Sequence, residues 1–125
     1  MTPEDKELLI KDLCARLPYG VIVETPKGNG HVCDINLTIF GYEFGVNVNP
    51  TIRDNFSISY IKPYLFPLSS MTDEQEKEYN NLNNCELGCF PHTEDALDYL
   101  LKNHFDYRGL IERGLAINAT NLNIY

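Results

Sequence analysis

The chain has 125 residues, of which 43% are hydrophobic and 22% charged, a composition typical of one globular domain. Eighteen Asp and Glu residues outnumber ten Lys and Arg residues, so the formal net charge is −8. Such a surface repels phosphate backbones, which disfavours direct nucleic-acid binding. The first residues are acidic and no apolar run approaches a membrane span of roughly 18 residues, so we expect a cytoplasmic protein with no membrane partner.

The first predicted element is a helix over residues 3–16. Thr2 is placed to cap this helix and Pro3 suits its first position, and the acidic residues that follow favour the positive end of the helix dipole. The residue before Pro18 is disfavoured in helical geometry, so the helix ends there. One apolar stripe at helical spacing predicts its buried face: Leu9, Ile10, Leu13, Cys14 and Leu17.

An alternating pattern then predicts four short strands, over residues 19–24, 33–39, 42–48 and 56–60. The turn formers at residues 25–30 indicate a hairpin between the first two strands. Cys33 lies on the apolar face of the second strand, and the alternation changes parity near Phe40 and Gly41, which predicts a turn or bulge there. Four such strands favour an antiparallel meander, as a curved sheet or a small SH3-like barrel.

The second half of the chain is expected to be helical and acidic, with ten acidic and four basic residues in 68–125. Residues 62–68 contain prolines that remove ladder donors, so we expect an extended crossing segment and not a central strand. A capping box at Thr72 to Gln75 predicts a helix to about Leu82. Another helix is predicted from Thr93, with the face Leu97, Leu100, Leu101 and His104.

The end of the chain is predicted to hold a short helix and an irregular tail. Asp106 is placed to cap that helix and Gly114 to end it, and residues 115–125 alternate weakly, as an edge strand or a draped extension would. The sequence therefore predicts an α+β fold in a single domain of residues 1–125. Residues 1–67 form a helix plus meander, and 68–125 form a helical region packed on it.

Three potential metal ligands lie close together in the sequence: Cys85, Cys89 and His92. Thiolate and imidazole groups suit zinc, and Cys33, His31 or His104 is a possible fourth ligand. The alternative is that the cysteines are thiols packed as small apolar groups. We assign no metal site, no cofactor and no catalytic residue from this pattern.

Residues 104–108 gather three polar groups that are able to act in acid-base catalysis, His104, Asp106 and Arg108, with Tyr107 between them as a packing residue in the structural interpretation. The structural interpretation is a connection between two helices. In that case Asp106 caps a helix and Arg108 pairs with a carboxylate such as Glu112, four residues later.

Two groups of residues are candidates for binding a partner protein. Asp73, Glu74, Glu76 and Glu78 place negative charge on the predicted acidic helix, either as a solvated face or as a docking surface for a basic partner. Tyr64 and Phe66 lie in the proline-flanked segment, where they are either interface aromatics or core residues.

Three blocks of the sequence resemble blocks of small uncharacterised proteins encoded by gut bacteria, their phages and mobile elements. They are LCARLPYGV, IKPYLFPLSSMT and NHFDYRGLI, at residues 13–21, 61–72 and 103–111. The resemblance implies a mobile-element setting and supplies no catalytic residues.

Taken with the acidic charge, these patterns predict a non-enzymatic protein–protein interaction module, an accessory protein of a phage or mobile element that binds a host or phage protein. The first alternative is a small enzyme or metal-binding factor that uses Cys85, Cys89, His92 and His104. The second is a nucleic-acid-binding small barrel.

Overall fold

The computed structural model of the chain describes residues 2–37, 44–49, 55–82 and 94–125. In these ranges the helices are α1 (Pro3–Arg16), α2 (Asp73–Leu82) and α3 (Glu94–Lys102). The strands are β1 (Ile22–Thr25), β2 (Gly28–Leu37), β3 (Phe44–Asn49), β4 (Asn55–Ser57), β5 (Lys62–Pro67), β6 (Phe105–Asp106) and β7 (Ile117–Asn118). Short 3-10 helices are η1 (Leu17–Tyr19), η2 (Ile58–Tyr60) and η3 (Leu68–Ser70).

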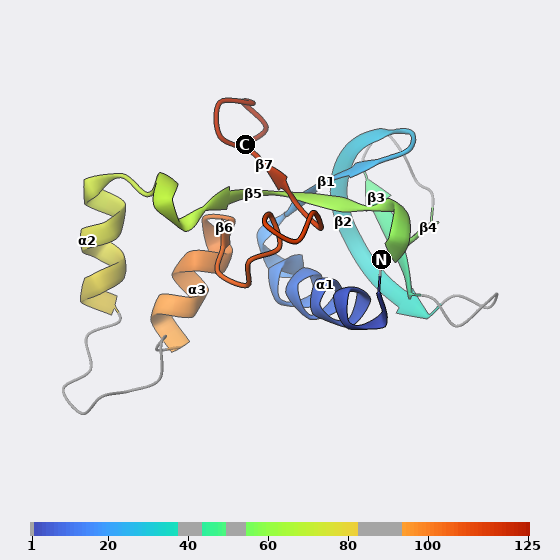
Figure 1. The fold of residues 1–125 in the computed structure, drawn as a ribbon, viewed down its shortest axis with the longest axis horizontal. Coiled ribbons are helices and arrows are strands. Elements are labelled where there is room, and N and C mark those ends of the chain that lie inside the picture. The colour runs from blue at the N-terminus through green and yellow to red at the C-terminus, as the bar shows by residue number, and fades with distance from the viewer. Residues whose placement is uncertain (1, 38–43, 50–54, 83–93) are drawn as a thin grey trace.

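The fold is α+β, with an open mixed sheet (Figure 1). Five strands pair antiparallel in the order β4-β3-β2-β1-β5, and the first four are the predicted meander. β6 and β7 each add a two-residue parallel pair to β5. In the described ranges no pairing closes β4 onto the other side of the sheet, so the strands form the curved-sheet alternative without barrel closure.

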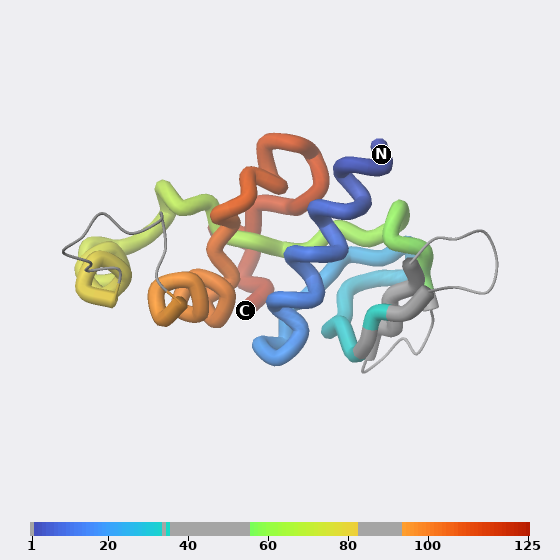
Figure 2. Tube along the Cα trace, turned by 90° about the horizontal axis from the view of Figure 1, so that it is seen from below, coloured from blue at the N-terminus to red at the C-terminus, as the bar shows by residue number. Residues whose placement is uncertain are grey.

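Helix α1 lies across the sheet and supplies one side of the core (Figures 1 and 2). Its predicted bounds are confirmed. Its predicted cap is confirmed as well, because the Thr2 hydroxyl accepts from the Asp5 N–H at 3.1 Å and the Asp5 carboxylate accepts from the Thr2 N–H at 3.4 Å. Leu9 and Leu13 of α1 are fully buried. They belong to one cluster with side chains of the sheet and of the C-terminal segment: Val21, Val23, Val32, Ile58, Ile61, Leu65, Leu110, Leu115 and Ala116.

The buried face of α1 differs from the predicted stripe. Cys14 is exposed, so its placement on the apolar face was wrong. Asp12 and Arg16 are buried in its place, beside Leu9 and Leu13. The spacing 9-12-13-16 follows one helix face, and the two charged residues are accepted there because they pair with each other.

The prediction that Cys33 faces the core is also wrong, because Cys33 is exposed. The register of β2 against β3 shifts between Val32 and Asp34, which is the mark of a β-bulge. The bulge lets both Val32 and Ile35 pack on the core. The parity change predicted at Phe40 and Gly41 lies outside the described residues.

Two predictions about residues 56–68 are corrected. Ile58–Tyr60 is the 3-10 helix η2 and not the end of a strand. Lys62–Pro67 is an interior strand, β5, and not merely an extended crossing segment. Its prolines are tolerated because each neighbouring strand pairs with it over only two residues. Beside β6 and β7, non-proline groups of β5 make the hydrogen bonds: the Phe66 N–H donates to the His104 carbonyl, and the Leu65 carbonyl accepts from the Ala119 N–H.

The C-terminal half is partly as predicted. The capping box of α2 is confirmed, since the Thr72 N–H donates to Gln75 Oε1 at 2.9 Å and the Gln75 N–H donates to the Thr72 hydroxyl at 3.2 Å. The prediction of a short helix after Asp106 is wrong, because residues 110–114 form turns. The tail contains β7 and so runs beside β5, as an added strand.

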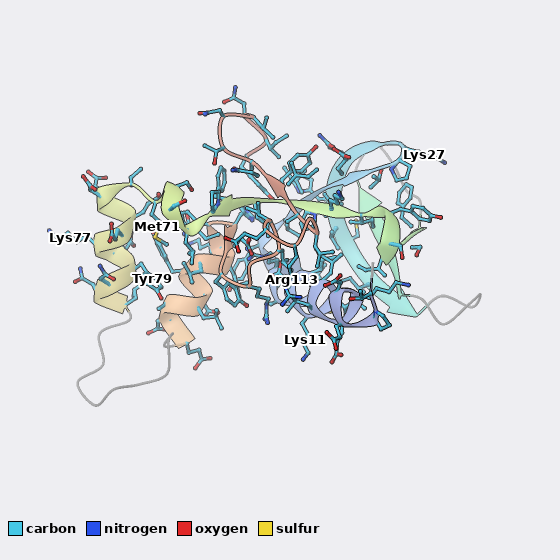
Figure 3. All side chains as sticks on the ribbon, in the orientation of Figure 1. Lys11, Lys27, Met71, Lys77, Tyr79 and Arg113 are labelled. Carbon is cyan, nitrogen blue, oxygen red and sulfur yellow. The ribbon has the colours of Figure 1, made fainter. Side chains whose placement is uncertain are left out.

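Helix α2 lies at one end of the molecule and buries none of its residues (Figure 1). It contacts α3, whereas α3 also contacts α1 and β6. Lys77 points away from the body and Tyr79 lies on the side of α2 that faces α3 (Figure 3). The main helix contact of α2 is therefore with α3, which in turn contacts α1 and β6.

Candidate functional site

A buried ion pair connects α1 to the start of β6. The Arg16 Nε donates to Asp12 Oδ2 at 2.7 Å, and Arg16 Nη2 donates to the Phe105 carbonyl at 2.5 Å. Both side chains are fully buried. Burial raises the pKa of the Asp12 carboxyl, while the positive charges of Arg16 and Arg108 act to lower it. The pair thus holds the His104–Arg108 segment against α1.

The polar residues of 104–108 mostly have structural partners. The Asp106 carboxylate accepts from the Leu110 and Ile111 N–H groups at 3.0 and 2.9 Å, so Asp106 caps a turn. Arg108 Nε lies 3.4 Å from Asp12 Oδ1, and it therefore pairs with α1 in place of the expected Glu112. The guanidinium groups of Arg16 and Arg108 lie 5.8 and 4.8 Å from the centroid of the Tyr107 ring.

His104 is the polar residue of this segment that lines a pocket, beside Phe105. Its ring stacks on Tyr125, with centroids 3.8 Å apart and planes at 12°. The Tyr125 hydroxyl accepts from the Ile22 N–H at 2.9 Å and donates to the Tyr64 carbonyl at 2.8 Å. Burial, followed by electrostatic repulsion from the neighbouring Arg16 and His31 side chains, lowers the pKa of His104 to about 4, so the imidazole is neutral at pH 7.

The partner-binding candidates separate into exposed and buried residues. Asp73, Glu74, Glu76 and Glu78 are all exposed on α2. Tyr64 is only 6% exposed, and its hydroxyl lies 3.2 Å from Glu24 Oε2 and 3.0 Å from Asn29 Oδ1. Phe66 is half-buried and packs against Phe105 and Tyr125. The structure does not bring the aromatics onto the acidic helix.

The predicted metal ligands Cys85, Cys89 and His92 lie outside the described residues. Within the described ranges, no group of three or more His, Cys, Asp and Glu residues is arranged to hold a metal ion. His104 is approached by Arg16 and His31 and is stacked on Tyr125, as described above.

Sequence reasoning missed Asp12, Arg16 and Tyr125. A signal was present for the first two, because Asp12 and Arg16 occur four residues apart on the face of Leu9 and Leu13. Tyr125 carries no comparable signal, since its partners Ile22 and Tyr64 are distant in the sequence.

No family model, curated protein or solved structure matches this chain. Within the described residues, none of the helices has the length and apolar character needed to span a membrane.

Proposed function

We propose that this chain is a non-enzymatic protein–protein interaction module, and that α2 is the surface on which a basic host or phage protein docks. The observation that carries the proposal is that α2 buries none of its residues and exposes four carboxylates. Because α2 has no buried residue, its exposed face is available for contacts with another protein. The mobile-element setting rests on the resemblance of the three blocks alone.

Charge complementarity supports a basic partner. Three of the four carboxylates lie in the first turn of α2, where they favour the helix dipole, but Glu78 lies beyond that turn. The only positive charge of α2 is Lys77. Negative surfaces of this kind speed association with basic partners and discriminate against acidic ones.

The structural roles found for Asp106 and Arg108 favour this proposal over acid-base catalysis. Asp106 accepts two backbone hydrogen bonds and Arg108 pairs with Asp12. A catalytic acid or base needs freedom to exchange a proton with substrate. These two groups are engaged in holding a turn and a helix together.

The test compares three versions of the tagged protein in nuclease-treated bacterial lysate, read by mass spectrometry. One is unaltered, and one carries Asp73→Asn, Glu74→Gln, Glu76→Gln and Glu78→Gln. The third is a control with the same change in net charge on exposed residues of α1 and α3, namely Glu4→Gln, Glu7→Gln, Asp95→Asn and Asp98→Asn.

We expect the unaltered protein and the control to capture the same basic protein, and the α2 variant to lose at least about tenfold in affinity for it, measured on the purified pair. Equal affinity of all three versions rules out α2 as the docking surface. Failure to capture any stoichiometric protein overturns the interaction module itself.

A further inference from the structure

A pocket of about 350 Å³ lies where β5 and η3 meet the end of α3 and the C-terminal segment. This volume is within the range of pockets that bind small molecules, roughly 300–1,000 Å³. Residues far apart in the sequence line it, from Phe66 to Tyr125. Gln75 of α2 also lines the pocket, but the four exposed carboxylates of α2 do not, so the pocket borders the proposed docking surface without including its charged groups.

One wall of the pocket is aromatic. Phe66 contacts Phe105 with centroids 6.3 Å apart and Tyr125 with centroids 5.9 Å apart, in tilted geometry. The stacked rings of His104 and Tyr125 continue this wall. Aromatic side chains favour flat unsaturated ligands through stacking and edge contacts.

The remaining wall is polar and carries one positive charge. Lys102 lines the pocket, and no Asp or Glu side chain does. This is unusual for a chain with a net charge of −8. No ion pair of Lys102 is found among the described residues, and the amide side chains of Asn103 and Asn121 lie on the same pocket. The lining therefore favours an anionic group beside hydrogen-bonding atoms.

The backbone around the pocket is unusual as well. His104 and Asn121 both line it, and both have left-handed backbone angles, with φ of 62° and 65°. Such conformations cost side-chain-bearing residues free energy and occur often at ligand sites. In addition, His104 is nine-tenths buried and its Nδ1 has no hydrogen-bond partner among the described residues.

We propose that this pocket binds a small anion that carries a flat unsaturated ring, with the ring against Phe66 and Tyr125 and the anionic group at Lys102. Nucleoside monophosphates and aromatic carboxylates share this chemistry. Binding one small anion is compatible with an acidic surface, because a single lysine at the pocket supplies the local charge that a long phosphate backbone would need from many residues.

The experiment titrates four probes into the ¹⁵N-labelled full chain and follows amide shifts by NMR. Adenosine monophosphate and benzoate carry both ring and charge, adenosine carries only the ring, and inorganic phosphate carries only the charge. We expect at least one of the first two to bind with a Kd below about 1 mM and to shift pocket amides, and the last two to bind at least about tenfold more weakly. Which of the first two binds more tightly distinguishes a nucleotide site from a carboxylate site.

Two lysine variants localise the binding. Lys102→Gln is expected to weaken the tighter probe at least about tenfold, whereas the matched control Lys77→Gln on α2 leaves the affinity unchanged. Lys102 is exposed, so the variant is expected to fold. The proposal is overturned if neither ring-bearing anion binds, if adenosine or phosphate binds as tightly, or if the two variants behave alike.

Discussion

At the scale of single residues, His104 has an environment very different from that of a solvent-exposed histidine. It follows α3 at a left-handed position where glycine is usual. It lies against Tyr125, and the neighbouring Arg16 and His31 side chains disfavour a proton on it. These contacts keep the imidazole neutral, because a proton on it has poor hydration and two unfavourable neighbours.

The lowered pKa of His104 predicts a specific loss of stability in acid. The pKa is about 4 in the folded chain and 6.5 in the ordinary state, so the unfolded chain binds the extra proton first as the pH falls. The contribution of neutral His104 to the free energy of unfolding is therefore fully present above about pH 6.5. It decreases by up to about 3 kcal/mol as the pH falls from 6.5 to 4. Urea unfolding at several pH values measures this loss.

The matched variant is His104→Asn, because asparagine adopts left-handed backbone angles and does not titrate. The free energy of unfolding of this variant is expected to fall less steeply between about pH 6.5 and pH 4 than that of the unaltered chain. If both show the same pH dependence, His104 is not the group that titrates.

The Asp12–Arg16 pair predicts a large effect of removing one partner. Arg16→Met leaves Asp12 as a buried carboxylate with its closest positive charge gone, and breaks the bond to the Phe105 carbonyl. We expect a decrease of about 3–5 kcal/mol in the free energy of unfolding. The control is Lys11→Met on the same helix, whose pair with Glu7 at 3.6 Å is solvent-exposed and contributes less than about 1 kcal/mol. Similar losses in the two variants, measured by urea denaturation, contradict the buried-pair account.

At the scale of elements, α1 and α2 could be predicted because their starting signals are local. Thr2 with Asp5, and Thr72 with Gln75, satisfy N-terminal amides within four residues of chain. The pairing of β1 with β2 could be predicted for the same reason, since the turn formers lie in the residues between them.

Elements that depend on distant partners could not be predicted in this way. The rule against proline in a central strand assumes long ladders, and β5 escapes it by pairing two residues at a time with three different strands. The bulge at Cys33 is set by how β2 pairs with β3, and not by the composition of β2. Turn residues after Asp106 replace a helix because the Asp106 carboxylate bonds to two amides of that segment.

The residues of the candidate site also divide into those set by local sequence and those set by distant partners. The sequence correctly marked Asp106 as an acceptor for backbone amides that follow it, but the predicted helix is absent and the carboxylate bonds to amides four and five residues later. The partner of Arg108 could not, since Asp12 lies almost a chain length away. Tyr125 and Lys102 become neighbours of one pocket only through the parallel addition of β6 and β7 to β5. Nothing local in the sequence encodes that arrangement.

At the scale of the whole molecule, stability is unevenly distributed. α1 places Leu9 and Leu13 in the main core cluster, whereas α2 buries no residue and contacts the body through α3. Segments with few buried apolar contacts open locally at lower free energy than the global unfolding reaction. We therefore expect α2 to unfold while α1 and the sheet stay folded.

Proline substitutions at two exposed lysines test this difference between the helices. Lys77→Pro interrupts α2 and Lys11→Pro interrupts α1, and each removes one exposed lysine from a helix interior. Breaking α2 cannot cost more than the free energy that holds α2 folded, so Lys77→Pro is expected to lower the free energy of global unfolding by less than about 1 kcal/mol. Lys11→Pro is expected to lower the free energy of global unfolding by at least about 3 kcal/mol, because α1 cannot unfold without opening the core.

Urea denaturation compares the two variants, and hydrogen exchange of the unaltered chain is expected to show α2 amides exchanging faster than those of α1. Equal losses would mean that α2 belongs to the same cooperative unit as the core, since only a shared unfolding reaction makes the two prolines equivalent.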